Sequence, residues 1–442
     1  MFNVCEYGII NDGASDNTDA LRALIEKMSP DGGTLYFPPG KYLTGSVELK
    51  SNMTLYLDAG AELLASGDRS RYPIIDSQRI PGLARRGYAG VICAFNAENI
   101  CVKGEGTING QGVNWWFGGP DGTRKEDDYM RPRSIYFVLC RNVRISGIRM
   151  IDSPCWTVHP LCCENVSITS VSIKNPPHSP NTDGINPESC RNVRISDCDI
   201  DVGDDCVTIT AGTENDPLQK LHPCENITVT GCTMSRGHGG VVIGSEMSGG
   251  VRNVAISNCV FRGTDRGVRI KTRRGRAGSV KNILINGLIM DGVGTPVTVN
   301  CYYRCGADMN DGRIFAPGAQ PLDETTPEIS GIRLRAVCAS GAKFAAMYFL
   351  GLPERPVEDV SLADVDIEMD GSFGADEPIM TPMHEKTCAA GVFMKNVRGL
   401  SLSGVRVKNA RGELFVTENC ENISGEVTQG KTDNGNLKSD KK

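Results

Sequence analysis

The chain has 442 residues, a formal net charge of −6 and only 6% aromatic residues. Its length allows two or three domains, yet no linker-like stretch occurs before a polar tail that starts near Lys431. The acidic balance disfavours a nucleic-acid partner, and no stretch approaches the roughly 20 apolar residues of a membrane span. We therefore expect one domain over residues 1–430 and a polar, disordered tail over residues 431–442.

The first residues contain no basic region followed by an apolar one, so no secretory leader is recognised. This predicts a cytoplasmic protein, or a secreted one if a leader has been removed. The 18 cysteines are then expected to be reduced. None of them forms a CxxC pair, so we expect neither a zinc site nor any other cofactor.

Residues 18–27 place Leu21, Leu24 and Ile25 on one face of a helix. Elsewhere short β-branched runs alternate with Gly, Asn and Asp, a pattern typical of many short strands. We expect an all-β protein with one short N-terminal capping helix, the cap and first coils occupying residues 1–64.

A phrase such as CRNVRIS, found at 140 and 190, recurs along most of the chain. From residue 142 its asparagine recurs at intervals of 23, 27, 34, 27 and 29 residues, at Asn142, Asn165, Asn192, Asn226, Asn253 and Asn282. Apolar residues alternate within each phrase, so each repeat buries one face, which only stacking can cover. This predicts a solenoid, specifically a parallel β-helix. The asparagines should form a ladder within a turn, with their amides bonded along the stack.

Cysteines also recur in register with the phrase. In one set the cysteine lies two residues before the asparagine of the phrase or its equivalent, at Cys140, Cys163, Cys190, Cys224 and Cys420. Another lies six residues after it, at Cys198, Cys232 and Cys259. We interpret both sets as small apolar side chains that fill equivalent slots in successive coils, in preference to redox or metal chemistry.

Polar groups recur between the phrases at intervals of about one coil. They are Asp183 of NTDG, Asp204 and Asp205 of GDD, His238 of GHG, and Arg269 and Lys271 of RIK. The parity of the strands turns most of them outward. Asp183 and Asp205 share parity with inward residues, so they reach the same wall only if Gly184 and Gly203 mark turns where the alternation breaks.

Three carboxyl groups beside a histidine have a direct chemical use. Crowded carboxylates cannot all ionise easily, so one retains a proton while others remain anionic. Glycoside hydrolysis needs such an acid and base. The alternative is that each aspartate only caps a turn, a common role of Asp, but four such motifs in consecutive coils favour a catalytic site.

A basic stretch lies beside these motifs, at Arg262, Arg266, Arg269, Lys271, Arg273, Arg274 and Arg276. In an acidic protein this indicates a specific anion, and a carboxylate-bearing sugar fits, with Arg269 as a fork and Lys271 as a point charge. We expect Arg273, Arg274 and Arg276 to form a solvated loop.

The ordered motifs NTDG, GDD, GHG and RIK resemble the signature of the polygalacturonases, glycoside hydrolase family 28. The opening segment resembles the family's cap, and RPRSIYF, SPCWTVHP and GHGGVVIGSEMSGGVRNV resemble its bacterial exo-acting branch. The resemblance implies a right-handed parallel β-helix that hydrolyses the α-glycosidic bonds of galacturonic acid in pectin fragments. It also implies inversion at the anomeric carbon without a metal.

By the same resemblance Asp204 is the general acid, Asp183 and Asp205 activate water, and His238 tunes the acid. Arg269 and Lys271 then hold the substrate carboxylate. The remaining candidates for substrate binding are Asn181, Trp156 and His159.

The sequence departs from the family in one place, where Thr210 and Ala211 stand for a Lys-Ser pair that members often carry. This keeps hydrolases of rhamnogalacturonan or xylogalacturonan open. A calcium-dependent pectate lyase or a non-catalytic β-helix adhesin are further alternatives.

Two long inserts precede the catalytic coils, residues 65–95 and 111–134. The second holds three aromatic residues, Trp115, Trp116 and Phe117. Inserts beside a groove can wall off one end of it. We therefore predict exo-action that releases monosaccharide from the non-reducing end.

Overall fold

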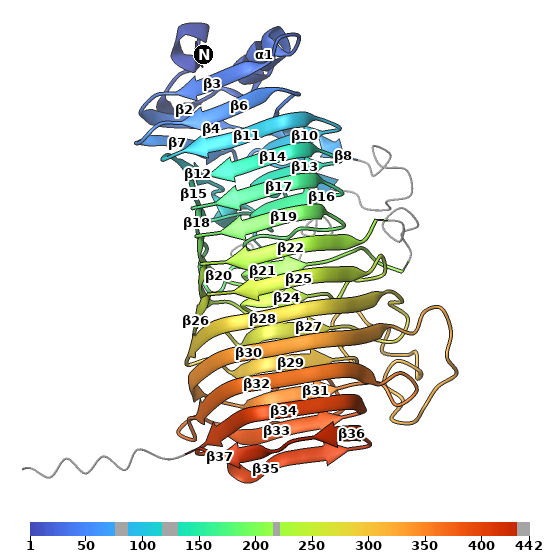
Figure 1. Cartoon of the computed structure of the whole chain (residues 1–442). Helices are drawn as coiled ribbons and strands as arrows, with labels where there is room; N and C mark the ends of the chain where they lie inside the picture. Colours follow the sequence, from blue (N-terminus) through green and yellow to red (C-terminus); the bar gives the residue numbers. More distant parts are fainter. Residues whose placement is uncertain (76–86, 117–130, 215–221, 431–442) are drawn as a thin grey trace, which may run out of the picture.

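The computed structural model describes residues 1–75, 87–116, 131–214 and 222–430. These residues wind into an elongated right-handed parallel β-helix whose coils stack from one end to the other (Figure 1). The pairing is parallel except for the β8–β9 ladder and two isolated bridges. The expected all-β solenoid is thus confirmed, and coil-to-coil pairing continues from Phe2 to Gln429. The predicted tail, 431–442, lies outside the described residues.

Two walls of the solenoid are built from separate strands in the earlier coils. In the later coils one long strand bends around the corner and belongs to both walls. The first wall contains β1 (Phe2–Asn3), β3 (Gly33–Phe37), β6 (Met53–Leu57), β11 (Glu98–Gly104), β14 (Arg141–Ser146), β17 (Glu164–Thr169), β19 (Arg191–Ser196), β22 (Cys224–Thr230) and β25 (Val251–Ser257). The second contains β2 (Asp12–Asp16), β4 (Gly40–Thr44), β7 (Ala61–Ala65), β12 (Thr107–Asn109), β15 (Arg149–Ile151), β18 (Ser172–Lys174), β20 (Asp199–Val202), β23 (Thr233–Arg236) and β26 (Val260–Arg262). The bent strands are β28 (Ser279–Asp291), β30 (Glu328–Ala342), β32 (Val357–Met369) and β34 (Val397–Lys408), followed by β36 (Glu421–Ser424) and β37 (Val427–Gln429).

The third wall positions the candidate site. It runs through β5 (Val47–Glu48), β10 (Ile92–Phe95), β13 (Ile135–Val138), β16 (Val158–Leu161), β21 (Val207–Ile209), β24 (Val241–Ile243), β27 (Arg266–Lys271), β29 (Thr295–Asn300), β31 (Ala345–Leu350), β33 (Ala390–Lys395) and β35 (Arg411–Glu418). Bridges at Ile185 connect β16 to β21 across one coil that forms no strand of its own. Outside the walls lie β8 (Ile74–Ile75) and β9 (Gly87–Tyr88) and, among the residues that the structure describes, the short 3₁₀ helices Val4–Tyr7, Arg69–Arg71 and Gly112–Asn114.

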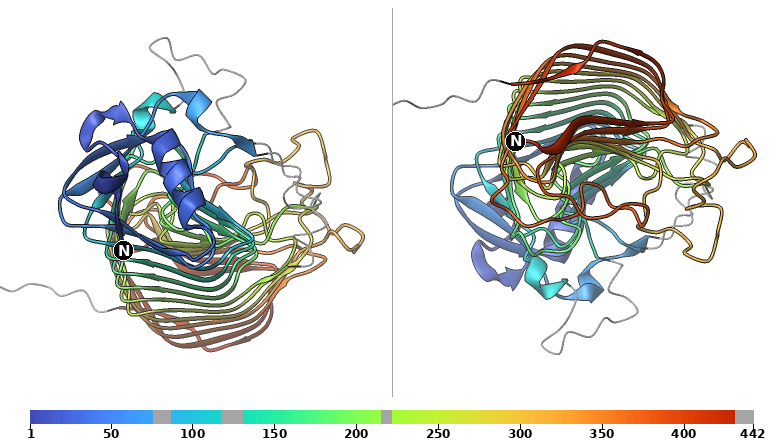
Figure 2. Two further views of the ribbon diagram at one scale, coloured as in Figure 1. Left: turned by 90° about the horizontal axis from the view of Figure 1, so that it is seen from above. Right: turned by 90° about the horizontal axis from the view of Figure 1, so that it is seen from below.

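The helix α1 (Thr18–Met28) covers the N-terminal end of the solenoid, as predicted. It buries Leu21, Leu24, Ile25 and Met28, and Figure 2 shows it lying across the first coils. No helix among the described residues has the length and apolar character needed to cross a membrane.

The asparagine ladder is confirmed, and it extends further than predicted. Asn99 Nδ2 donates to Asn52 Oδ1 at 2.7 Å, and the same bond repeats at 3.0–3.2 Å through Asn142, Asn165, Asn192, Asn226, Asn253 and Asn282. Each of these asparagines has a φ between 55° and 62°, the left-handed region that Asn tolerates better than most residues. Asn therefore satisfies both the backbone and the hydrogen bonds at this turn.

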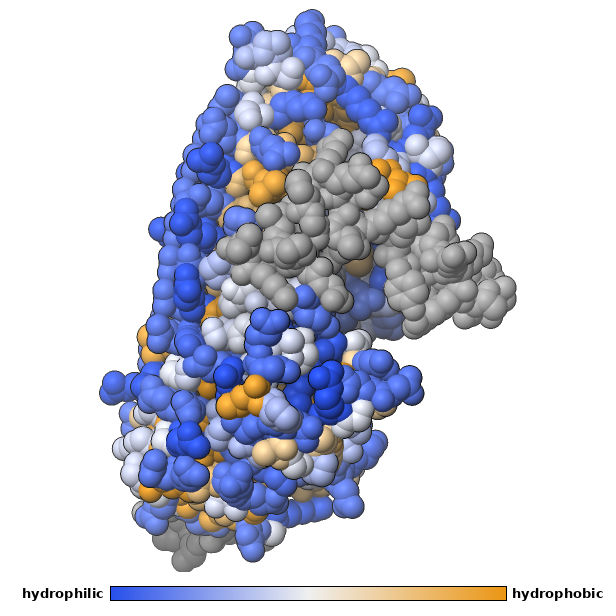
Figure 3. All heavy atoms as spheres, turned by 90° about the vertical axis from the view of Figure 1, so that its right-hand side faces the viewer, coloured by the Kyte–Doolittle hydropathy of each residue, from blue (hydrophilic) through white to orange (hydrophobic). Residues whose placement is uncertain are grey.

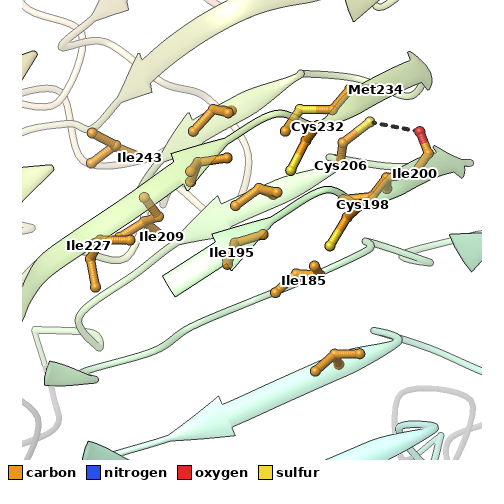
Figure 4. Close-up of a cluster of buried hydrophobic side chains, with 14 of the residues drawn as sticks. Ile185, Ile195, Cys198, Ile200, Cys206, Ile209, Ile227, Cys232, Met234 and Ile243 are labelled. Atoms are coloured by element: carbon orange, nitrogen blue, oxygen red, sulfur yellow. Dashed lines mark hydrogen bonds between the residues drawn. The ribbon is translucent and has the colours of Figure 1, made fainter. Parts of the chain in front are cut away.

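The interior is filled by the alternating apolar residues of all three walls. Figure 4 shows Ile195, Cys198, Ile200 and Cys232 gathered there, among isoleucines of neighbouring coils. All 18 cysteines are free thiols, and those of the two sets are buried, apart from the partly buried Cys420. Their burial in the interior agrees with the packing role that the sequence predicted.

Candidate active site

The register of the third wall brings the predicted groups together. Equivalent positions in four successive coils are held by Ile185, Val207, Val241 and Val268. Asp183 and Asp205 each lie two residues before such a position, and Asp204 and His238 each lie three residues before one. Oxygen atoms of the three aspartates lie within 4.8 Å of one another.

Asp183 faces the outer side of the wall although it shares parity with an inward isoleucine. Its Oδ2 accepts hydrogen bonds from Thr208 Oγ1 at 3.0 Å and from Asn186 Nδ2 at 3.1 Å. Thr208 and Asn186 alternate with inward residues, so both belong to the outer face. The alternation therefore breaks after Asp183, as the predicted convergence required.

The two glycines beside the aspartates are needed for space. A Cβ on Gly184 would lie 2.4 Å from the Cys206 carbonyl oxygen, and one on Gly203 would lie 2.5 Å from that of Ser179. Both oxygens belong to backbone that cannot move without disturbing a neighbouring segment. Close approach, and not a left-handed conformation, fixes Gly at these turns.

Asp205 is held by the two cations predicted to bind substrate. Lys271 Nζ lies 2.8 Å from its Oδ2, and Arg269 Nη1 lies 3.4 Å from its Oδ1, with all three side chains buried. Burial acts to lower the pKa of Lys271, but the charge of Asp205 outweighs burial, so the pKa is raised. The ring of Tyr303 lies 5.1 Å from the Lys271 ammonium and 5.4 Å from the Arg269 guanidinium. Tyr303, which sequence reasoning missed, thus stabilises both cations through its ring face.

Asp204 and His238 form an ion pair, with Nδ1 of His238 3.5 Å from Oδ1 of Asp204. The hydrogen bond to Asp204 raises the pKa of His238 to about 9, although burial opposes the shift. Burial acts to raise the pKa of Asp204, but His238 overcomes it and the net shift is downward. At Asp183 burial and the charges of Asp204 and Asp205 raise the pKa well above its usual range. These shifts keep His238 protonated at neutral pH and make Asp183 harder to ionise than an isolated aspartate.

Asn181 lies at the mouth of the site. Its Nδ2 is 3.5 Å from Asp204 Oδ2, and its Oδ1 accepts a hydrogen bond from Arg131 Nη2 at 2.8 Å. Arg131 is buried and also donates to the carbonyl oxygens of Pro154 and Pro180. Arg131 was not predicted, because no local pattern relates it to a residue 50 positions later.

Trp156 and His159 lie one coil before Asp183, as predicted. Trp156 is half-buried, whereas His159 is buried and has its Nε2 2.8 Å from Glu188 Oε2. The His159 ring stacks on Tyr136 at 5.0 Å and meets the edge of Trp156 at 4.7 Å. Trp156 can therefore offer a surface to a substrate, while His159 forms part of the floor beneath it.

The expectation of a solvated loop at Arg273, Arg274 and Arg276 is wrong. All three are buried, and Arg274 Nε lies 2.6 Å from Glu354. Arg273 and Arg276 both pair with Glu214. These carboxylates come from distant parts of the chain, so local composition could not reveal them.

A right-handed parallel β-helix with clustered carboxylates and adjoining cations on one wall defines a carbohydrate-active solenoid enzyme. Residues 83–388 match the family model described as Glycosyl hydrolases family 28, and residues 1–118 match one described as Rhamnogalacturonase A/epimerase, pectate lyase-like. A probable polygalacturonase of Vitis vinifera is 34% identical over 377 residues, 83% of this chain and 74% of the relative. The chain therefore belongs to glycoside hydrolase family 28.

Two solved structures are similar to the whole arrangement. An exopolygalacturonase from Thermotoga maritima has a TM-score of 0.74 and 31% identity, covering 83% of this chain and 87% of its own. A family 28 exopolygalacturonase from Yersinia enterocolitica has a TM-score of 0.77 but 20% identity, covering 97% and 78%, and so shows the fold alone. Family membership makes the protein a glycoside hydrolase, and the predicted lyase and adhesin alternatives are set aside. The narrower placement in a bacterial exo-acting branch is not shown, since plant polygalacturonases match as well.

Proposed function

We propose that the protein hydrolyses α-glycosidic bonds of galacturonic acid in pectin fragments, with exo-action on oligogalacturonides. One observation carries this proposal: three carboxyl groups with oxygens within 4.8 Å of one another adjoin a buried Arg-Lys pair. The carboxyl groups supply acid and base, and the cations match the carboxylate of a uronic acid.

The Asp204–His238 pair is proposed to deliver the proton to the leaving oxygen. Asp204 is the more exposed carboxyl of the three, so it can reach a bound glycoside. The pair carries one proton below pH 9, resident on the imidazole in the free site. Asp183 and Asp205 then activate water as a coupled unit, because burial and the neighbouring carboxylates make Asp183 harder to ionise on its own.

Inversion at the anomeric carbon rests on resemblance to the family and not on spacing. The carboxylate oxygens lie closer together than the roughly 6.5–9.5 Å between carboxyl groups usual for inverting glycosidases. Proton NMR of the first product decides: a β-configured reducing end supports inversion, and an α-configured one refutes it.

The proposed chemistry uses no metal. The three carboxylates could share a cation, but Lys271 and Arg269 already lie against Asp205, where they neutralise negative charge. Full turnover after treatment with EDTA is expected, and a loss that calcium restores would contradict the proposal.

Exo-action is supported by the described part of the second insert. Trp116 Nε1 donates to the Ser153 carbonyl oxygen at 3.0 Å, and its ring meets His178 at 5.9 Å. With Arg131 bonded to Asn181, the two described ends of this insert are both anchored on the N-terminal side of the carboxylates. Trp115 is instead buried against Tyr72, and Phe117 lies outside the described residues.

Figure 3 shows that the coloured residues of the face on the right of Figure 1, where the 301–327 loop projects, are mainly hydrophilic. Such a surface suits a carbohydrate. A time course on polygalacturonic acid tests the mode of attack. Free galacturonic acid should appear first while viscosity falls slowly, whereas an early ladder of oligomers with a rapid fall in viscosity would establish endo-action.

Thr210 favours a second candidate, a hydrolase of rhamnogalacturonan or xylogalacturonan. It lies in the outer column of the third wall that also contains Gly244 and Lys271, and its buried hydroxyl has no hydrogen-bond partner among the described residues. Thr210 stands where family members often carry Lys, so this column has one cation fewer to hold a uronic acid. Faster cleavage of rhamnogalacturonan or xylogalacturonan than of homogalacturonan would establish this candidate.

A further inference from the structure

Arg133 lies in the same row of the third wall as the catalytic aspartates. Ile135 of β13 pairs with Val158 of β16. Arg133 lies two residues before Ile135, and Trp156 lies two residues before Val158. Asp183 and Asp205 hold this same position in the next two coils. Because paired strands lie about 4.8 Å apart, Arg133 is two coil spacings, roughly 10 Å, from Asp183 along the wall.

The guanidinium of Arg133 is held between aromatic rings. It lies 5.2 Å from the ring centre of Trp156 and 5.3 Å from that of Tyr136. The contact with Trp156 tilts the cation one coil towards Asp183. Its side chain is half-buried, and its Nε is shielded from solvent without a hydrogen-bond partner.

Among the described residues, the side chain of Arg133 forms no hydrogen bond or ion pair, unlike the side chains of its basic neighbours. Arg131, two residues earlier, donates to three oxygen atoms. Arg269, on the opposite side of the site, lies against Asp205. A partly buried guanidinium that lacks an anion loses solvation, and ring faces replace only part of it. The arrangement is therefore ready for an incoming anion.

The cations around the site are placed on both sides of the carboxylates. Arg269 and Lys271 approach Asp205 from the C-terminal side, two coils away. Arg133 approaches Asp183 from the N-terminal side. A glycosidic bond held between the aspartates thus has a positive group beside each of the two sugars that it joins.

We propose that Arg133, held over Trp156, binds the carboxylate of the uronic acid on the N-terminal side of the scissile bond. The exposed part of Trp156 then packs against the sugar ring. This inference rests on the proposed function, since it names a recognition element for the same substrate. It makes recognition of the free acid two-sided: both sugars that flank the bond must carry a carboxylate for full affinity.

The test replaces Arg133 with Met, which keeps the apolar stem but removes the charge, and with Lys, which keeps the charge but removes the fork. The exposed Arg149 on the second wall supplies the control, Arg149→Met. Kinetics are measured on trigalacturonic acid and on its fully methyl-esterified form. A charge-assisted hydrogen bond is worth roughly 10- to 100-fold in affinity, so Arg133→Met should raise KM for the acid by about that factor. We expect kcat within about 3-fold of the parent, little change on the ester, and an intermediate KM for Arg133→Lys.

A binding experiment separates this inference from the proposed function. Calorimetric titration of digalacturonic acid into Asp204→Asn, with and without Arg133→Met, measures affinity without turnover. Weaker binding with Arg133→Met supports the carboxylate contact even if the preferred substrate differs from homogalacturonan. Equal affinity, or an equal rise in KM on acid and ester, would overturn it. If Arg133→Met unfolds at a lower temperature than the parent, Arg133→Lys decides: a KM on the acid equal to the parent's refutes recognition through the fork.

Discussion

The asparagine turn and the catalytic row occupy the same coils but differ in what they demand of the sequence. At the turn, every coil from residue 52 to residue 282 holds Asn with φ near 60°. In the row, five successive coils hold four different residue types, at Arg133, Trp156, Asp183, Asp205 and Gly239. Where the backbone adopts a left-handed conformation, conformation selects the residue. Where it stays extended beside a groove, the chemistry of the ligand selects it.

The substitution Asp204→Asn should have the largest effect, because it changes chemistry while leaving the scaffold intact. It replaces a partly exposed side chain by one of the same shape that cannot accept the proton of His238 and pass it to the leaving oxygen. Turnover should fall by about 10²- to 10⁴-fold. Initial rates on trigalacturonic acid and the midpoint of thermal unfolding are the measurements. An Asn variant that keeps half of the parent rate would remove Asp204 from the mechanism.

The buried ion pair of Arg274 and Glu354 belongs to the basic segment, but it stabilises the fold and does not face the site. Arg274→Ala leaves a buried carboxylate without its partner, which costs about 3–5 kcal/mol of unfolding free energy. Arg333→Ala breaks an exposed pair with Asp359 and should cost no more than about 1 kcal/mol. Urea denaturation of both variants checks this, and equal losses would show that Arg274 is solvated after all.

The ladder itself can be broken at Asn192, in the middle of the stack. Asn192→Ala removes hydrogen bonds on both sides and puts Ala in a left-handed conformation. We expect the lost hydrogen bonds and the strained backbone together to lower the free energy of unfolding by about 1–3 kcal/mol. Asn192→Gly should cost less, because Gly adopts this conformation freely. Denaturation midpoints compare them, and equal losses would mean that conformation does not select Asn here.

The pH dependence of activity should report the Asp204–His238 pair. The pKa of His238 is about 9 in the folded protein against roughly 6.5 when unfolded, so the pair stabilises the fold fully below pH 6.5. That contribution is lost as the pH rises through 9. If catalysis needs the imidazolium, the pH profile of kcat/KM has a falling limb over the same range. The His238→Gln variant should lack this limb. Because His238 is half-exposed, salt should shift the limb to lower pH. A limb that persists in His238→Gln must belong to another group.

Periodicity alone was enough to predict the coils, the ladder and the outward placement of Arg269 and Lys271, because each depends on spacing along the chain. The convergence of Asp183 with Asp205 needed a break in alternation that is visible only in space. Thr208 could have been found, since it follows Asp205 at outward parity. Tyr303 could not, because its contact with the cations depends on the path of the chain after β29. The burial of Arg274 could not be predicted either, because its partner Glu354 lies 80 residues away in the sequence.

The ladder spacing has a consequence for how loops can change. Loops between coils vary so that the ladder asparagines recur after 23 to 47 residues, yet residue-to-residue alignment of adjacent strands stays fixed. Insertions can therefore accumulate in a loop without displacing Asp183 relative to Asp205. A slip of one residue between these two coils would turn one of the carboxylates towards the other face. Enzyme turnover thus serves as a sensitive gauge of whether neighbouring coils have closed in correct alignment during folding.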